Sequence, residues 1–164
     1  MASNRKELLN ATKKFCDAFS QKKDPQFILS MFTTRIPISA IEYGDPQQAP
    51  FLGRTFEGHD GVQEYFRIIS ELLSYENMSF SEYVVDVEEG KVSVKGRAKF
   101  TWLATGKAWD ETFAYVLDFD EAKISRYQIW SDTGSAYLAS LLNDGSTFIQ
   151  PSSRYYSWSV LPVD

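Results

Sequence analysis

One acidic side chain stands where acid/base chemistry would need it. Glu111 alternates with Trp109 and Phe113 in a strand-like stretch, so the three side chains share one apolar face. A carboxylate on a buried face is costly unless it is paired, hydrogen-bonded or protonated, and burial raises its pKa toward the range that general acids and bases use. The pattern leaves two interpretations of Glu111: a general acid or base in an apolar pocket, or a buried ion pair at a strand end.

Other polar side chains are candidates for completing such a site. Tyr115, which follows Phe113 on the same face four residues beyond Glu111, offers a phenol that can donate to a developing oxyanion. Arg126, Gln128 and Asp132 share one face of the next expected strand, where they could meet Glu111 across the strand pair. Arg126 or Gln128 would then orient the carboxylate. Asp132 fits a catalytic role and the cap of the last helix equally well.

Arg35 and His59 are two further candidates for a chemical role. Arg35, at the start of an expected strand, could bind a carbonyl or carboxylate at the mouth of a pocket, or be an exposed strand-end arginine. His59 is the only histidine, but its place in a loop before a helix favours a structural role. The side chains expected to enclose a flat substrate are Tyr65, Phe100, Trp102, Trp109, Phe113, Gln128 and Trp130.

The elements that must position these residues follow from hydrophobic periodicity. Asn4 with Glu7, and Asp24 with Pro25, look like helix starts. Helical spacing predicts helices at residues 5–21, at 25–31, along a stripe from 62 to 73 capped by Asp60, and at 134–142. Period-two alternation or strand composition predicts strands at residues 36–43, 79–88, 91–104, 107–120 and 122–132. Short turns join the last four strands, so these should be antiparallel neighbours.

This order of elements predicts an α+β fold with helices packed on one face of a sheet. In the strand 91–104, the small residues Gly96 and Ala98 lie on the inward face. Small residues at mid-strand either relieve curvature or leave space beside them. The sequence does not decide between these two interpretations.

Length and composition limit the possible functions. The chain has 164 residues, which suits one domain with its own core, and aromatic residues make up 15% of it. The formal charge of -5 argues against nucleic acid and anionic membranes as partners. No apolar run is long enough to span a bilayer, and residues 1–14 do not look like a signal peptide, so a cytoplasmic protein is expected. The single Cys16 is expected in the core.

Three segments carry a resemblance to a known family. Residues 58–62 read Gly-His-Asp-Gly-Val, Tyr65-Phe66 follow on the same helix, and the strand meander ends in Ile-Trp-Ser-Asp at 129–132. Together they resemble the SnoaL-like branch of the nuclear-transport-factor-2-like (NTF2-like) superfamily over residues 5–142. The resemblance implies a cone-shaped fold, in which a curved, mixed or antiparallel sheet wraps on N-terminal helices around an internal pocket. It also implies a homodimer packed through the sheet.

The start of the chain is similar to small fungal members of this branch, at Phe15–Phe19, Asp24-Pro25 and Phe32–Thr34. Such members act as isomerases or cyclases in meroterpenoid and indole-alkaloid biosynthesis, and generally work without metal or redox cofactor. In accord with this, the sequence has no histidine cluster for a metal and no dinucleotide or phosphate-loop motif. Scytalone dehydratase, a related enzyme, uses a pair of histidines, which this chain lacks.

The sequence therefore predicts one SnoaL-like domain over residues 1–164 that acts without a cofactor as an isomerase or cyclase. Its substrate would be a hydrophobic, polycyclic intermediate of secondary metabolism, such as a meroterpenoid, polyketide or indole alkaloid. Two alternatives stay open: a non-catalytic protein that binds or templates a small molecule, and an interaction module like the transport-factor members. The tail at residues 143–164 would form a lid or a dimer contact.

Overall fold

A computed structural model describes residues 4–142 of the chain. Over this range the helices are α1 (Arg5–Ser20), α2 (Pro25–Leu29), α3 (Gly58–Leu72) and α4 (Thr133–Ser140). The strands are β1 (Ser39–Tyr43), β2 (Thr55–Glu57), β3 (Leu73–Asp86), β4 (Lys91–Trp102), β5 (Ala108–Asp120) and β6 (Lys123–Trp130). The sequence-based predictions for the tail at 143–164 lie outside the described residues.

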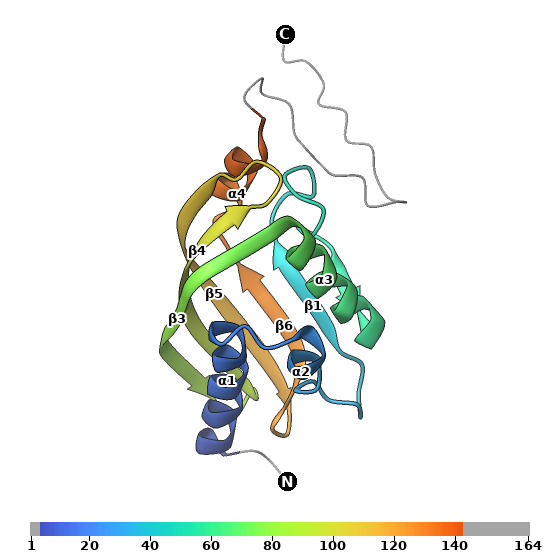
Figure 1. Cartoon of the computed structure of the whole chain (residues 1–164). Helices are drawn as coiled ribbons and strands as arrows, with labels where there is room; N and C mark the ends of the chain where they lie inside the picture. Colours follow the sequence, from blue (N-terminus) through green and yellow to red (C-terminus); the bar gives the residue numbers. More distant parts are fainter. Residues whose placement is uncertain (1–3, 143–164) are drawn as a thin grey trace.

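One curved sheet organises the fold. Its strand order is β2-β1-β6-β5-β4-β3, and every neighbouring pair is antiparallel except β1 with β6. Helices α1, α2 and α3 lie over one face of the sheet, here called the inner face, and α4 lies at one end (Figure 1). The predicted α+β class and cone-shaped architecture are therefore confirmed.

Two of the helix starts have the caps that the sequence predicts, and one does not. The side chain of Asn4 accepts from the backbone of Glu7 and Glu7 caps in return, as its spacing predicts. Asp24 caps α2 ahead of Pro25. The predicted cap of α3, Asp60, is wrong, because β2 runs almost directly into the helix. Gly58 makes that sharp entry with a φ of 70°, a conformation that glycine adopts without strain.

Strand β3 begins at Leu73, six residues before the predicted start at 79. Register shifts interrupt its pairing with β4 between Glu76 and Ser79 and again between Ser81 and Val84. Asn77 and Glu82 have positive φ values there. Each irregularity breaks the period of two, so residues 73–84 give no continuous alternation in the sequence.

The core lies between the inner face and the helices. Phe15 and Cys16 of α1 are fully buried, which confirms the expected place of the cysteine. Burial raises the pKa of Cys16 to about 12, so the thiol is inert at neutral pH. None of the described helices is both long and apolar enough to cross a membrane.

The role of Gly96 is settled by its cross-strand partner. Gly96 pairs with Phe113 of β5, and a Cβ at position 96 would come within 2.1 Å of the Phe113 ring. The space left by the missing side chain is therefore filled by an aromatic ring. The small residue allows close packing on the inner face at this point.

Candidate functional site

Glu111 lies on the inner face near the start of β5, where it pairs with Ala98 of β4. Glu111 is 7% exposed, and the indole Nε1–H of Trp109 donates to its Oε2 at 2.6 Å. Burial raises the pKa of Glu111 to about 7, and the hydrogen bond from Trp109 only partly opposes that effect. Both protonation states are therefore populated near neutral pH, which suits a group that must accept and return a proton.

A second buried carboxylate, Glu42, faces the same interior from β1. It is 6% exposed and accepts hydrogen bonds from the hydroxyl of Tyr65, at 2.7 Å, and from that of Ser131. Burial raises the pKa of Glu42, and its negative charge contributes to raising the pKa of Glu111. The sequence reasoning missed Glu42, because alternation in this short strand would turn the apolar Ile41 inward and Glu42 outward, the reverse of what the structure shows.

Two successive residues after β6 hold both carboxylates. The hydroxyl of Ser131 donates to Glu42, and the backbone N–H of Asp132 donates to Glu111. The Asp132 side chain itself caps α4, where it accepts from the backbone N–H of Ser135 at 3.0 Å and from its hydroxyl at 2.6 Å. These hydrogen bonds lower the pKa of Asp132. The helix-cap interpretation of Asp132 is therefore the one that the structure supports.

Tyrosines add protonated donors to this interior. Tyr115 and Tyr127 are 5% and 2% exposed, their ring centroids lie 4.9 Å apart, and their hydroxyls are hydrogen-bonded to one another. Burial raises the pKa of both phenols well above the usual value, so they keep their protons. Tyr65, another predicted site residue, is 4% exposed and donates to Glu42.

Three predicted site residues lie on the outer face of the sheet instead of beside Glu111. The Tyr43 hydroxyl donates to Gln128 at 3.0 Å, Arg126 contacts that hydroxyl, and Trp130 stacks on the Tyr43 ring at 4.6 Å. The expected meeting of Arg126 or Gln128 with Glu111 is therefore wrong. Trp130, which is 44% exposed, does not wall the interior.

A bulge explains this error. The pairing of β5 with β6 shifts register between Asp118 and Phe119, opposite Arg126 and Ile124. A bulge inserts an extra residue, so side chains beyond it change face. Ile124 and Tyr127 consequently both point inward, whereas strict alternation puts Ile124 on the same face as Arg126.

Arg35 also lies away from the inner face. Its side chain is 60% exposed and pairs with Glu121 at 2.7 Å and Asp120 at 3.6 Å. The exposed alternative is therefore the one that the structure supports. His59 is the second residue of α3, and its chemical role stays untested.

Aromatic side chains continue the inner face toward the β4–β5 turn. Phe100 stacks on Trp109 with centroids 5.7 Å apart, and Phe113 packs edge-on against Phe100. Trp102 is 1% exposed, and its buried indole Nε1 has no acceptor among the described residues. A buried donor without a partner is unfavourable, so Trp102 is a costly feature of this end of the inner face.

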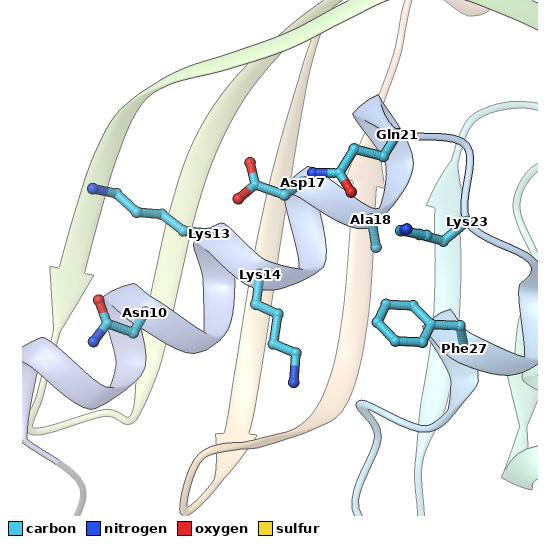
Figure 2. Close-up of a pocket in the computed structure, with 8 residues that line it drawn as sticks. All are labelled: Asn10, Lys13, Lys14, Asp17, Ala18, Gln21, Lys23 and Phe27. Carbon is cyan, nitrogen blue, oxygen red and sulfur yellow. The ribbon is translucent and has the colours of Figure 1, made fainter.

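The described surface has a pocket of about 370 Å³ on the outer side of α1. Figure 2 shows it between α1 and the start of α2, with Lys14, Lys23 and Phe27 around its opening. Its lining includes Ala18 but neither of the buried glutamates. This basic, open pocket is distinct from the acidic and aromatic inner face.

Solved structures show which fold this is. An NTF2-like protein of unknown function from Burkholderia pseudomallei is 17% identical over 81% of this chain and 96% of its own, with a TM-score of 0.68. A proposed isomerase from Bacillus subtilis is 12% identical over 87% and 96%, with a TM-score of 0.70. TerC, co-crystallised with polyporic acid, is 19% identical over 81% and 97%, with a TM-score of 0.68.

Other similar structures include proposed polyketide cyclases, one of them described as SnoaL-like. No protein-family model matches the chain, and no curated protein matches its sequence. The chain has the NTF2-like fold that SnoaL-like proteins share. Because one fold hosts many activities, its function must be argued from the site.

Proposed function

We propose that the protein is a cofactor-independent isomerase or cyclase that acts by general acid/base catalysis through Glu111. Its substrate would be a small, hydrophobic, polycyclic intermediate of secondary metabolism, such as a meroterpenoid, polyketide or indole alkaloid. The observation that carries the proposal is a carboxylate with a pKa of about 7, buried beside Trp109 on an aromatic inner face. Structures described as proposed isomerases and cyclases, and one holding polyporic acid, support it.

The proposed chemistry needs only proton transfer. Ionised Glu111 takes a proton from a carbon next to a carbonyl group, and the electron pair of the C–H bond moves toward the carbonyl oxygen. Returning the proton from Glu111 to a different atom completes an isomerisation. Alternatively, the enolate carbon attacks a second carbonyl in the same molecule, and Glu111 protonates the resulting alkoxide as the ring closes.

The neighbouring side chains have separate roles in this proposal. Protonated Tyr115 stabilises negative charge on the substrate oxygen, because its raised pKa keeps it a hydrogen-bond donor. Glu42 is held by Tyr65 and Ser131 and raises the pKa of Glu111, so it acts as a positioning residue.

The test replaces Glu111 with glutamine and follows proton exchange in 2-tetralone, a bicyclic ketone with acidic C–H bonds. We expect the wild-type protein to accelerate exchange of these protons in D2O, measured by NMR. Glu111→Gln should lower the acceleration by about 10²–10⁴-fold, the usual contribution of a general acid or base. Circular dichroism would check that the fold is retained.

Asp110→Asn is the matched control, since Asp110 is the adjacent acid on the exposed outer face. It should retain wild-type exchange. Undiminished exchange in a folded Glu111→Gln variant would remove Glu111 from the mechanism. Exchange by the wild-type protein no faster than in buffer would count against the activity itself.

We further propose that the chain forms a homodimer through the outer face of its sheet, as its resemblance to the superfamily implies. The half-exposed Trp130 ring stacked on Tyr43 is the feature of this face that supports the proposal.

A further inference from the structure

The described interior contains negative groups without a positive partner. Among residues 4–142, the buried side chains of acidic or basic type are Glu42 and Glu111, and no lysine, arginine or histidine is buried. A buried charge is stable only when it is paired, hydrogen-bonded or neutralised by a proton. These two glutamates meet that requirement with hydrogen bonds and raised pKa values.

The arginines near the sheet are engaged elsewhere. Arg35 is exposed and pairs with Glu121, and Arg126 contacts the Tyr43 hydroxyl on the outer face. Arg54 lies over the ring of Phe56 at 4.1 Å. The positive charge that would complement the two glutamates is therefore not supplied by these side chains.

The surroundings of the glutamates also suit a cation. Tyr65, Tyr115 and Tyr127 stand close enough for their electrostatic interaction with Glu42 to contribute to their raised pKa values, and Trp109 contacts Glu111 directly. The faces of such rings attract cations, and the attraction is stronger where water is excluded. An anionic ligand would meet only repulsion from the glutamates.

We propose that the ligand of the inner face carries a protonated amine, which pairs with Glu111 and is further attracted by Glu42. This inference rests on the proposed function in taking the same face as the site, and it narrows the substrate class to amine-bearing polycycles. The amine supplies the charge that the described interior lacks. The same electrostatics would make carboxylate and phosphate ligands bind more weakly than an amine.

A cationic ligand would also set the protonation state of Glu111. Opposite charge favours the ionised carboxylate, so binding expels the proton that Glu111 carries in part at pH 7. The other titratable groups facing Glu111 are Glu42, Asp132 and Tyr65. Asp132 is already ionised and Tyr65 stays protonated, so Glu111 is the expected source of a released proton.

Three probes of nearly equal shape test the inference: tryptamine, tryptophol and indole-3-acetate, with charges of +1, 0 and -1 at pH 7. Isothermal titration calorimetry in phosphate and imidazole buffers would give both the affinity and the number of protons released. We expect tryptamine to bind about tenfold or more tightly than indole-3-acetate, with tryptophol between them. Tryptamine alone should release a fraction of a proton.

Glu111→Gln should remove most of this charge preference and most of the proton release, while Asp110→Asn should keep both. Equal or tighter binding of tryptophol, or failure of all three probes to bind, would overturn the inference. Its failure is separable from that of the proposed function. If the protein accelerates proton exchange in the ketone but does not prefer tryptamine, the proposed activity is supported and the binding inference fails. If it prefers tryptamine but does not accelerate exchange, the binding inference is supported and the proposed activity fails.

Discussion

Glu42 and Glu111 are equally buried but are held in different ways. Glu42 accepts from two hydroxyl groups, whereas Glu111 accepts from the Trp109 indole and one backbone N–H. The hydroxyl donors fix Glu42 within the wall formed by β1 and α3. Glu111 stands among aromatic rings, where a substrate skeleton would lie. This contrast agrees with the roles proposed for them, in which Glu111 carries the proton and Glu42 supports it.

The raised pKa of Glu111 predicts how stability depends on pH. The carboxyl titrates near 4.5 in an unfolded chain and near 7 in the folded protein, so the folded state holds its proton more tightly. The resulting stabilisation is fully present below pH 4.5 and is lost as the pH rises to 7. Glu111→Gln, which carries no charge at any pH, should therefore match the wild type at pH 4.5. At pH 8 it should be more stable by on the order of 2–3 kcal/mol.

Urea unfolding at both pH values would measure this difference. Asp110→Asn, which changes an exposed acid next to it, should show no comparable gain at pH 8. A Glu111→Gln variant that is less stable than the wild type at pH 8 would contradict the prediction. It would mean that the ionised carboxylate is better stabilised in the folded protein than its burial implies.

The candidate site was predictable only where the signal was local. Alternation of Glu111 with Trp109 and Phe113 placed that carboxylate inward without knowledge of the fold. Glu42 occupies a strand of five residues in which Ile41 points away from the interior and Ala40 points into it. Glu42 reaches the interior because β1 pairs in parallel with β6. This pairing joins segments that are distant in the sequence, so no local pattern predicts it.

At the scale of elements, helices and strands were predictable but some strand faces were not. Four helices and the β4–β6 meander lie close to their predicted ranges, because each repeats its pattern over several turns or residue pairs. Strand β2 was not predicted, because its three residues are too few to show a period of two. The bulge in β6 places Arg126 and Gln128 on the outer face, and no turn residue or glycine at that point indicates the bulge.

The close packing of β4 and β5 gives a prediction about Gly96. A Cβ at this position would overlap the Phe113 ring, which is held by Phe80, Phe100 and Tyr115. Gly96→Ala should therefore destabilise the protein by about 1–3 kcal/mol through overpacking, although alanine suits a strand better than glycine. Urea unfolding would measure the loss.

Ser93→Ala, on the outer face of the same strand, should change stability by less than about 0.5 kcal/mol. If the Phe113 ring is the cause, Gly96→Ala combined with Phe113→Leu should be more stable than the sum of the two single changes implies. Strict additivity, or a stabilising Gly96→Ala, would show that the ring moves aside freely.

At the scale of the whole molecule, the sheet separates two environments. Its inner face carries two glutamates and aromatic rings, covered by α1, α2 and α3 (Figure 1). Its outer face carries a polar network in which Gln128 joins Tyr43 to Asp118. Chemistry on one face and association on the other would therefore not compete for the same side chains.

The proposed homodimer predicts that one outer-face ring controls assembly. Trp130 is 44% exposed, and a tryptophan at the centre of an interface typically contributes about 2 kcal/mol or more when it is removed. Trp130→Glu also introduces a charge on each subunit, so it should weaken dimerisation by at least about 30-fold. Sedimentation velocity at several concentrations would show a dimer for the wild type and a shift toward monomer for Trp130→Glu.

Leu138→Glu is the matched control, because Leu138 is 64% exposed but belongs to α4 at the end of the sheet. A monomeric wild type, or a dimer lost with Leu138→Glu and retained with Trp130→Glu, would place the contact elsewhere. Since Glu111 is on the opposite face from Trp130, the monomeric Trp130→Glu variant should still accelerate ketone exchange, which would show that each subunit carries a complete site.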